Sequence, residues 1–360
     1  MQALILAGGQ GTRLRPLTLT VPKPVVPIID RPHMVHMIEW LKGYGVDDVV
    51  LACGHMSQGI KDALGDGTSA GARIRYVEEP EPRGTAGAIK EAEALLEERF
   101  LVLNGDILAD LDLSPLLELH ESTGSLASIG LIPVEDPSAF GVVVTDAANG
   151  VEAFVEKPAP GEAPTNLINA GVYVLERVIL DDVPAGQDVS IERDVFPRLA
   201  GSGLHAIELG GHWIDIGTPE RYLDAHWAVL EGEIGGGNGL DGGAGGVTIG
   251  FDCEVDGEVA GAAWLDDEVT VGEGANVGPR VAIGAGSTIG AGATVTNSVL
   301  LTGVTVGEGA VIEGAIIAHG AVIGEDAKLG PDVVVGERAT VAAGSELGPG
   351  ERVAPVVEDE

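Results

Sequence analysis

Residues 4–27 read LILAGGQGTRLRPLTLTVPKPVVP, and this stretch decides how the first part of the chain folds. A short apolar run ends at Gly8 and Gly9, which is the pattern of a buried strand that stops in a glycine-rich loop. Such a loop lets main-chain N–H groups approach phosphate oxygens closely. Arg13 and Lys23 follow, and prolines restrict the backbone around them. The segment therefore predicts a preorganised anion-binding loop at the end of a strand.

Strand and helix patterns alternate beyond this segment. Apolar runs at 46–52, 73–78 and 100–106 predict strands, while residues 33–45 and the segment that starts at Gly84 predict helices. The alternation predicts an α/β fold with a doubly wound, mostly parallel, Rossmann-like sheet. Ligands of such sheets bind at the carboxyl ends of the strands. In this sequence those ends carry Gly8-Gly9, Glu78-Glu79 and Gly105-Asp106.

The C-terminal part of the chain is a six-residue repeat. Aliphatic residues recur at every sixth position from Val271 to Val295 and from Ile323 to Val341, mostly followed by glycine. A six-residue period predicts three short strands per turn of a prism, with one aliphatic residue per face pointing inward. The pattern resembles hexapeptide-repeat proteins, whose fold is a left-handed parallel β-helix, and about four turns fit it. The phase slips by one residue at 296–300 and at 313–317.

A change in composition separates the two parts. Residues 1–230 contain 25 glycines, and residues 231–360 contain 30. The stretch GEIGGGNGLDGGAGG, residues 232–246, is too rich in glycine to hold a helix. We therefore expect a catalytic domain at 1–230, a glycine-rich linker at 231–246 and a β-helix domain at 247–360.

The charge of the chain restricts its partners. A formal net charge of −36 repels nucleic acid and anionic lipid, and no apolar run reaches the length of a membrane helix. Of the 20 lysines and arginines, 11 fall within residues 1–100, so phosphate chemistry is expected there. Two cysteines, 200 positions apart, form no disulfide framework and indicate a reducing cytoplasm.

The segment 4–27 resembles the signature of nucleotide-sugar pyrophosphorylases, which reads G-G-x-G-T-R-L, then P-L-T, then P-K-P. The resemblance covers nearly all of residues 1–230, and the appended β-helix also occurs in this family. It implies that an NTP and a sugar-1-phosphate give an NDP-sugar and pyrophosphate, with Mg²⁺ as cofactor. The branch that the pattern resembles uses GTP and α-D-mannose-1-phosphate. The further motifs that carry the resemblance are YVEEPEPRGTAGA (76–88), LVLNGD (101–106), FGVV (140–143), FVEKP (154–158), INAGVYV (168–174) and WIDIGTPERY (213–222).

The resemblance also implies roles that suit the residue types. Arg13 binds the nucleotide phosphates, and Lys23 neutralises the attacking phosphate. Asp106 and Asp215 hold Mg²⁺, which takes few protein oxygens. Further implied nucleotide contacts are Leu6, Ala7, Gly8, Gly9, Gly11, Thr12, Arg13, Glu79, Gly84, Thr85, Asn104 and Gly105. The implied sugar-1-phosphate contacts are Gly141, Glu156, Lys157, Asn169, Ala170 and Gly171.

Glu79 bears on the choice of base. Guanine presents two adjacent donors, N1–H and N2–H₂, which one carboxylate accepts together, whereas uracil and thymine place one donor between two carbonyls. A carboxylate at this position therefore favours GTP. The alternative is that Glu79 faces solvent beside Glu78 and Glu81.

Two other functions stay open at this point. One is the same chemistry with another substrate pair, glucose-1-phosphate with dTTP or UTP. The other is a non-catalytic regulatory subunit of a pyrophosphorylase complex, although such a subunit is expected to lose part of the set formed by Arg13, Lys23, Asp106 and Asp215. We also expect a homo-oligomer, because stacked β-helix coils offer flat faces and an open end.

Overall fold

The computed structural model describes residues 1–235 and 245–356, so most of the predicted linker lies outside the described residues. The chain divides into two compact units. The sheet unit contains residues 1–9 and 37–213, and the coil unit contains residues 10–36 and 214–360. The expected domain boundaries at residues 230 and 246 stay predictions.

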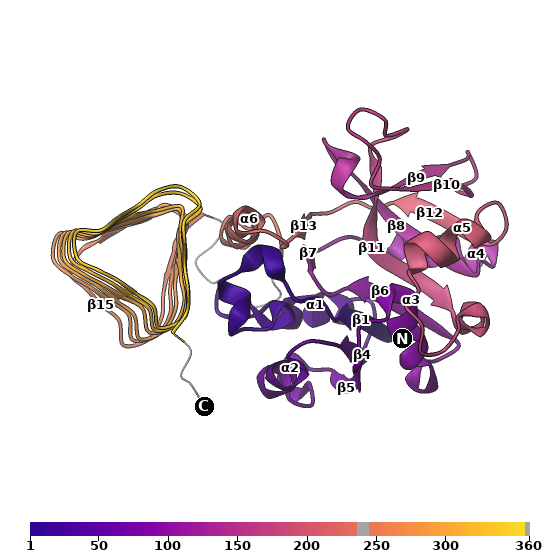
Figure 1. Cartoon of the computed structure of the whole chain (residues 1–360), viewed down its shortest axis with the longest axis horizontal. Coiled ribbons are helices and arrows are strands. Elements are labelled where there is room, and N and C mark those ends of the chain that lie inside the picture. The colour runs from indigo at the N-terminus through magenta and orange to yellow at the C-terminus, as the bar shows by residue number, and fades with distance from the viewer. Residues whose placement is uncertain (236–244, 357–360) are drawn as a thin grey trace. The chain divides into compact units, whose positions relative to one another are not determined.

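The sheet unit is built on a nine-stranded sheet (Figure 1). Its centre is parallel: β1 (Gln2–Ala7) lies between β4 (Asp48–Cys53) and β6 (Arg99–Asn104), and β5 (Arg73–Glu78) pairs with β4. This part confirms the expected Rossmann-like fold. Beyond β6 the sheet becomes mixed through β11 (Leu167–Glu176), which runs antiparallel to both β6 and β8 (Ala127–Pro133).

This half of the sheet is more antiparallel than the sequence pattern predicted. The physical reason is visible at β9 (Gly141–Thr145) and β10 (Val151–Glu156), which are joined by a short turn, and a short turn can only join antiparallel neighbours. The last strand, β12 (Leu204–Glu208), pairs parallel to β8 at the edge. Besides short 3₁₀ turns, further elements up to residue 213 are α1 (His33–Lys42), α2 (Ser57–Leu64), α3 (Gly84–Glu91), β7 (Ile107–Ala109), α4 (Ser114–Thr123), the π-helical turn η8 (Ile191–Val195) and α5 (Phe196–Leu199).

The core of the sheet unit follows the central strands. Leu4 and Ile5 of β1 are on opposite faces of the sheet, and both are fully buried, as expected of a strand covered on both sides. Helix α3 packs against β1, and α4 packs against β8, β11 and β12. Within the described part of the chain, no helix is both long enough and apolar enough to cross a bilayer.

The coil unit begins with the loop that carries the predicted cations and ends in the repeat region. The loop contains three short 3₁₀ turns, η1 (Thr12–Leu14), η2 (Leu17–Leu19) and η3 (Lys23–Val25), and the strand pair β2 (Pro27–Ile28) and β3 (Arg31–Pro32). Strand β13 (Trp213–Asp215) and helix α6 (Pro219–Leu230) precede the repeats.

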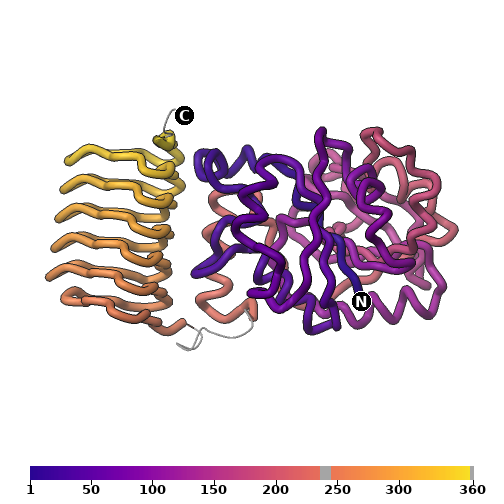
Figure 2. The backbone as a smooth tube through the Cα atoms, turned by 90° about the horizontal axis from the view of Figure 1, so that it is seen from below, coloured from indigo at the N-terminus to yellow at the C-terminus, as the bar shows by residue number. Residues whose placement is uncertain are grey.

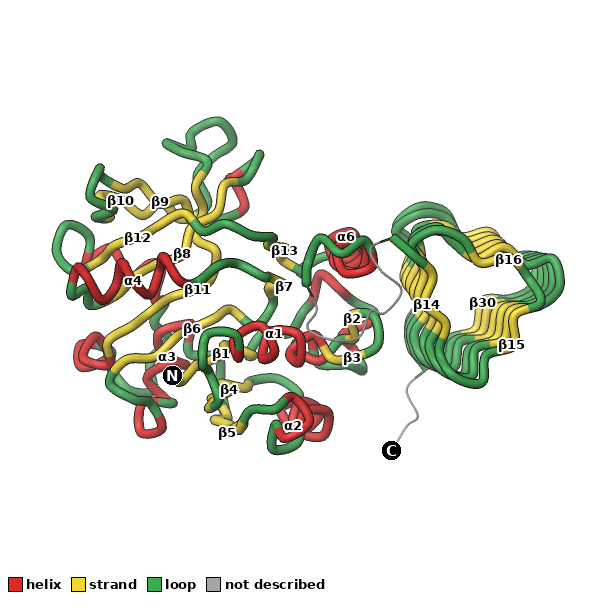
Figure 3. Tube along the Cα trace, turned by 180° about the vertical axis from the view of Figure 1, so that it is seen from behind, coloured by secondary structure: helices red, strands yellow, loops and turns green. Residues whose placement is uncertain are grey.

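The repeats form three parallel sheets that enclose a triangular core (Figure 3). This arrangement is consistent with the expected left-handed β-helix. One sheet has seven strands and the other two have six each, so the described residues form six full coils and one extra strand, stacked as Figure 2 shows. The expectation of about four turns was too low. At the N-terminal end the spacing shortens to four residues between Val255 and Val259, and at the C-terminal end the repeat continues past Val341 to Leu347 and Val353.

Strand registers explain how the six-residue spacing fills the core. Val271, Ile289, Val306, Ile323 and Val341 are paired in turn from one coil to the next, and none is more than 5% exposed. One sheet contains β14 (Val247–Ile249), β17 (Ala263–Leu265), β20 (Val281–Ile283), β23 (Ser298–Leu300), β26 (Ile316–Ile317), β29 (Val334–Val335) and β32 (Arg352–Val353). The second contains β15 (Glu254–Val255), β18 (Thr270–Val271), β21 (Thr288–Ile289), β24 (Thr305–Val306), β27 (Val322–Ile323) and β30 (Thr340–Val341). The third contains β16 (Glu258–Val259), β19 (Asn276–Val277), β22 (Thr294–Thr296), β25 (Val311–Glu313), β28 (Lys328–Leu329) and β31 (Glu346–Leu347).

Candidate active site

The glycine loop after β1 meets the ends of neighbouring strands within the sheet unit. Gly105 donates its N–H to the carbonyl of Leu6 at 2.9 Å, and a Cβ at Gly105 would lie only 2.6 Å from that oxygen. Gly8 faces Glu79, because a Cβ at Gly8 would lie 3.3 Å from Glu79 Oε1. The structure thus brings together predicted nucleotide residues from the carboxyl ends of β1, β5 and β6.

Glu78 and Glu79 are adjacent, but their surroundings differ. Glu78 is exposed and accepts hydrogen bonds from Lys61 and Ser57. Glu79 is half-buried, and this burial raises the pKa of its carboxyl group, although the main-chain N–H of Arg83 opposes the change. Glu79 therefore faces the glycine loop, which argues against the alternative that it faces solvent.

The start of α3 packs against residues 187–192. Gly84 has a φ of +66°, and a Cβ there would lie 2.6 Å from the carbonyl oxygen of Val189, so only glycine fits. Thr85 donates its hydroxyl to Glu192 Oε2 at 2.7 Å. The hydroxyl of Thr85 is thus used within the protein, and a nucleotide contact at this residue falls to its main chain.

The predicted cations belong to the loop of the coil unit. Gly11 has a φ of +60°, and the hydroxyl of Thr18 donates to its carbonyl at 2.7 Å. A Cβ at Gly11 would lie 3.2 Å from the Cβ of Lys23, so the loop closes tightly over the lysine stem. Lys23 is only 8% exposed, whereas lysines are almost always exposed on protein surfaces. Its burial favours a functional role over that of a solvated surface cation.

Arg13 and Asp215 lie together in the coil unit. The guanidinium Nη2 of Arg13 is 3.8 Å from Asp215 Oδ2, and the two side chains are 62% and 23% exposed. Gly217 makes room for the pair, because a Cβ there would collide with the Arg13 guanidinium and lie 2.8 Å from Asp215 Oδ1. Most of the Arg13 fork is therefore open to an anionic ligand. Thr12, also exposed, precedes it in the same turn.

Two aspartates, one in each unit, are the predicted ligands of a metal ion. Asp106 follows Gly105 after β6, and Asp215 ends β13. In residues 1–235 and 245–356, no group of three or more histidine, cysteine, aspartate or glutamate side chains is placed to hold a metal ion. An aspartate carboxylate is the kind of ligand that Mg²⁺ prefers, since this ion takes few protein oxygens and completes its shell with phosphate and water.

The motifs around β9 and β10 gather part of the predicted sugar site in the sheet unit. Gly141 is paired with Glu156, and a Cβ at Gly141 would lie 2.9 Å from Glu156 Oε2. Lys157 has a φ of +49°, which is uncommon for a residue with a side chain, and its N–H donates to the carbonyl of Phe140 at 3.0 Å. Its Nζ lies 4.0 Å from Glu156 Oε1, and the Lys157 side chain is 66% exposed. Such backbone outliers cluster at functional sites.

A bulge in β11 lies where a predicted nucleotide contact, Asn104, meets predicted sugar contacts. The register with β8 shifts between Asn169 and Tyr173, and Gly171 within the shift has a φ of +71°. A Cβ at Gly171 would lie 2.6 Å from the side-chain nitrogen of Asn104. Bulges of this kind often lie next to active sites because they redirect a side chain. Asn104, Asn169 and Gly171 are thus neighbours.

Sequence reasoning missed two residues of this region. Trp213 donates its indole N–H to the carbonyl of Ala170 at 2.8 Å, and its ring meets that of Phe140 edge to face at 5.7 Å. Trp213 is the first residue of the motif 213–222 and one of only four tryptophans in the sequence, and these two features could have identified it. Glu192 lies outside all quoted motifs, so no local pattern distinguished it from the other acidic residues.

Comparison with known proteins identifies the families that the two parts of the chain match. The family model described as nucleotidyl transferase matches residues 2–232, and the model described as GMPPB C-terminal domain matches residues 259–345. A mannose-1-phosphate guanylyltransferase of Mycobacterium tuberculosis is 37% identical over 283 residues, which cover 78% of this chain and 77% of the relative. A UTP–glucose-1-phosphate uridylyltransferase of Synechocystis is 38% identical over 250 residues, covering 65% of this chain and 64% of that protein.

A solved structure is also similar. The crystal structure of HddC from Yersinia pseudotuberculosis complexed with GMP-PN shares 33% identity and a TM-score of 0.54. The match covers 62% of this chain and 97% of that one.

Proposed function

Because the chain belongs to the nucleotidyl transferase family, we propose that it transfers a guanylyl group from GTP to α-D-mannose-1-phosphate, giving GDP-mannose and pyrophosphate. Members of this family are enzymes, and the chain therefore transfers a nucleotidyl group from an NTP to a sugar-1-phosphate. The M. tuberculosis relative is named a mannose-1-phosphate guanylyltransferase, which supports both GTP and mannose-1-phosphate as the substrates proposed here. The name of the Synechocystis relative supports the alternative, UTP with glucose-1-phosphate.

The single observation that carries the choice of GTP is the position of Glu79. Its half-buried carboxylate faces the glycine loop at Gly8, where a nucleotide is expected. Guanine offers this carboxylate two adjacent N–H donors, whereas uracil and thymine would turn a carbonyl oxygen towards it. An unmatched polar group at such a site costs about 1–3 kcal/mol, which is enough to select between bases.

The reaction joins two anions, so catalysis consists of positioning and charge neutralisation. An oxygen of the sugar phosphate forms a bond to the α-phosphorus, and pyrophosphate leaves with the electrons of the bond that breaks. Lys23 neutralises the attacking phosphate and the α-phosphoryl group. The open guanidinium of Arg13 binds the nucleotide phosphates through its planar fork and stabilises the leaving pyrophosphate.

Enzymes of this family generally use a divalent metal ion. We propose Mg²⁺, held by Asp106 and Asp215; when bound, it supplies further charge neutralisation on the phosphates. Asp215 also keeps the Arg13 guanidinium within 3.8 Å. On the sugar side, Lys157 binds the phosphate of the sugar-1-phosphate. Glu156 accepts hydrogen bonds from hexose hydroxyls, and Asn169 lines the hexose pocket.

A turnover screen tests this proposal. Pyrophosphate release is measured with GTP, ATP, UTP, CTP and dTTP, each against mannose-1-phosphate and glucose-1-phosphate. We expect GTP with mannose-1-phosphate to have the highest kcat/KM. If UTP or dTTP with glucose-1-phosphate has a higher kcat/KM, that pair is the substrate pair and the proposed choice of GTP and mannose-1-phosphate is wrong. Pyrophosphate release from no pair at all would favour the regulatory-subunit alternative.

We also propose that the enzyme is a cytoplasmic homo-oligomer. Both cysteines are free thiols, which suits a reducing compartment. Among residues 1–235 and 245–356, the strands at either end of the β-helix stack pair with a neighbouring strand on one side only, and such open edges favour association. Light scattering at micromolar concentration tests the oligomer, and a monomeric mass contradicts it.

A further inference from the structure

We infer that Glu192 is a positioning residue that ties the nucleotide-binding start of α3 to the sugar-binding bulge of β11. The inference rests on the proposed roles of Thr85 and Asn169. Glu192 lies in η8, a single π-helical turn, and such turns are frequent at functional sites. Ser190 caps this turn by accepting a hydrogen bond from the N–H of Arg193 at 3.2 Å.

One carboxylate oxygen of Glu192 fixes the nucleotide side. Oε2 accepts the hydroxyl protons of Thr85 and Ser190, each at 2.7 Å. The Thr85 oxygen in turn accepts the N–H of Ile191 at 2.8 Å. Thr85 therefore has both a donor and an acceptor partner, and its side chain has one allowed orientation.

The other carboxylate oxygen fixes the sugar side. Oε1 accepts the hydroxyl proton of Tyr173 at 3.4 Å, and the Tyr173 oxygen accepts the side-chain N–H of Asn169 at 2.7 Å. The Asn169 carbonyl oxygen accepts the N–H of Gly171 at 2.9 Å. Tyr173 is fully buried, so water cannot replace either partner.

The direction of these bonds follows from the chemistry of Glu192. An ionised carboxylate only accepts hydrogen bonds, so Tyr173 must donate to it and can then only accept from Asn169. This order decides which end of the Asn169 amide faces Tyr173. One N–H and one lone pair of Asn169 are left for a ligand, and their positions depend on Glu192.

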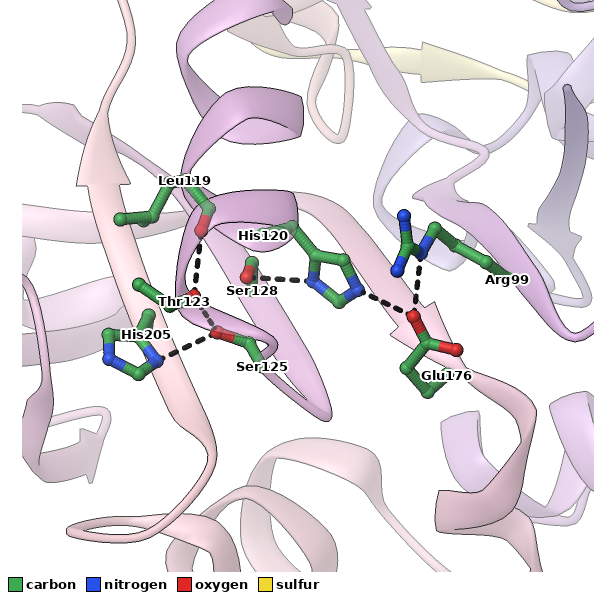
Figure 4. Close-up of polar contacts among 8 residues, drawn as sticks. All are labelled: Arg99, Leu119, His120, Thr123, Ser125, Ser128, Glu176 and His205. Atoms are coloured by element: carbon green, nitrogen blue, oxygen red, sulfur yellow. Dashed lines mark hydrogen bonds and ion pairs between the residues drawn. The ribbon is translucent and has the colours of Figure 1, made fainter.

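A second network at the far end of β11 provides a matched control. Glu176 accepts hydrogen bonds from His120 at 3.1 Å and from Arg99 at 2.6 Å, and His120 also contacts Ser128 at 2.9 Å (Figure 4). None of these side chains belongs to the predicted substrate contacts. Both glutamates hold buried hydroxyl or imidazole groups, so Glu176→Gln disturbs a similar network without reaching the site.

The experiment compares KM values for the two substrates in four variants. Glu192→Gln keeps the shape but leaves one acceptor oxygen in place of two, because the amide nitrogen can only donate. Tyr173 and the pair Thr85 and Ser190 then compete for that oxygen, so we expect KM to rise about tenfold for both substrates. Tyr173→Phe should raise only the KM for the sugar-1-phosphate, and Thr85→Val only the KM for the NTP. Glu176→Gln should lower the melting temperature and leave both KM values within twofold.

Two results would overturn the inference. One is a folded Glu192→Gln enzyme with both KM values unchanged; the other is an equal rise of both KM values in Glu176→Gln. If Glu192→Gln does not fold, Tyr173→Phe and Thr85→Val provide the test. Each should change the KM of one substrate, so equal KM changes for both substrates in each variant would contradict the inference. The measurements use whichever NTP and sugar-1-phosphate the unaltered enzyme turns over fastest, so a wrong substrate pair alters the proposed function alone.

Discussion

The β-helix and the part of the chain that precedes it, residues 1–235, bury their side chains in different ways. Within the described residues, the β-helix buries only two polar side chains, Ser287 and Ser298, and each donates to a nearby carbonyl at 2.7 Å. The buried polar side chains of the preceding part are Gln2, Thr18, Lys23, His33, His36, His120, Ser125, Ser128, Ser190 and His226.

This difference indicates which buried residues contribute only to stability and which have a role of their own. Each coil of the β-helix places aliphatic side chains at the same inward positions, so these residues are nearly equivalent and stabilise the fold through packing. A buried lysine or histidine, by contrast, is costly unless particular partners compensate it. We therefore expect substitutions at the buried polar positions of residues 1–235 to change activity or pH behaviour, and those in the β-helix to change stability alone.

The largest expected effect is at the buried lysine of the cation loop. Lys23→Ala removes a charge from the transferring phosphoryl group, and we expect kcat to fall by about 10²–10³-fold, as with other preorganised charges. The matched control is Lys328→Ala, an exposed lysine of the β-helix that pairs with Glu346 at 2.7 Å and should leave kcat unchanged. A Lys23→Ala enzyme with turnover within a few-fold of normal would remove the basis of the proposed function.

The next effect concerns the β-helix core. Ile312 is fully buried, and Ile312→Ala should lower the free energy of unfolding by about 3 kcal/mol, because it creates a cavity. Denaturant unfolding measures this change, and kcat of the folded enzyme should stay the same. Val311, its neighbour, is 39% exposed, so Val311→Ala should change stability by less than about 0.5 kcal/mol. An equal loss of unfolding free energy in the two variants would contradict the assignment of Ile312 to the core and Val311 to the surface.

A third effect is acid sensitivity arising from a buried histidine of α6. Burial lowers the pKa of His226 from its usual 6.5 to about 4, although its hydrogen bond to the Tyr222 carbonyl opposes this change. Between these values the unfolded chain binds more protons than the folded one, so stability falls as the pH drops from 6.5 towards 4. The loss is up to about 3 kcal/mol.

His226→Gln removes this titration, and its stability should depend less on pH over the same range. Unfolding at pH 4.5, 5.5, 6.5 and 7.5 measures the slope. The control is His212→Gln, because His212 has a side chain that is 53% exposed. If His226→Gln and the unaltered protein lose stability in parallel, burial of this imidazole is not the source of the acid sensitivity.

The smallest effect concerns the base. Glu79→Gln keeps one acceptor for guanine but loses the second, so we expect the preference for GTP over UTP, measured as a ratio of kcat/KM values, to fall about tenfold. Glu78→Gln changes the adjacent exposed carboxylate, which binds Lys61 and Ser57, and should leave the ratio unaltered. A ratio that is the same in both variants would show that Glu79 does not contact the base.

Much of this architecture could be predicted because the relevant signals are local. The strand at 73–78 has the predicted bounds, and the strand before Gly8 and the helix within 33–45 are both present, as β1 and α1. The sequence could not show that the sheet becomes antiparallel beyond β6, because strand order depends on contacts between distant segments. The count of turns missed the outer coils of the β-helix, because the spacing is irregular before Leu265 and the regular repeat was followed only as far as Val341.

The sequence by itself determined the kinds of residue present, the glycine loop with its cations and the repeat, since each is a pattern within a few neighbouring residues. Only the tertiary structure decided that Glu79 rather than Glu78 faces Gly8, and that the Thr85 hydroxyl is already bound to Glu192. The physical reason is that hydrogen bonds and burial join residues about 100 positions apart, and no local spacing encodes which of many carboxylates will meet them.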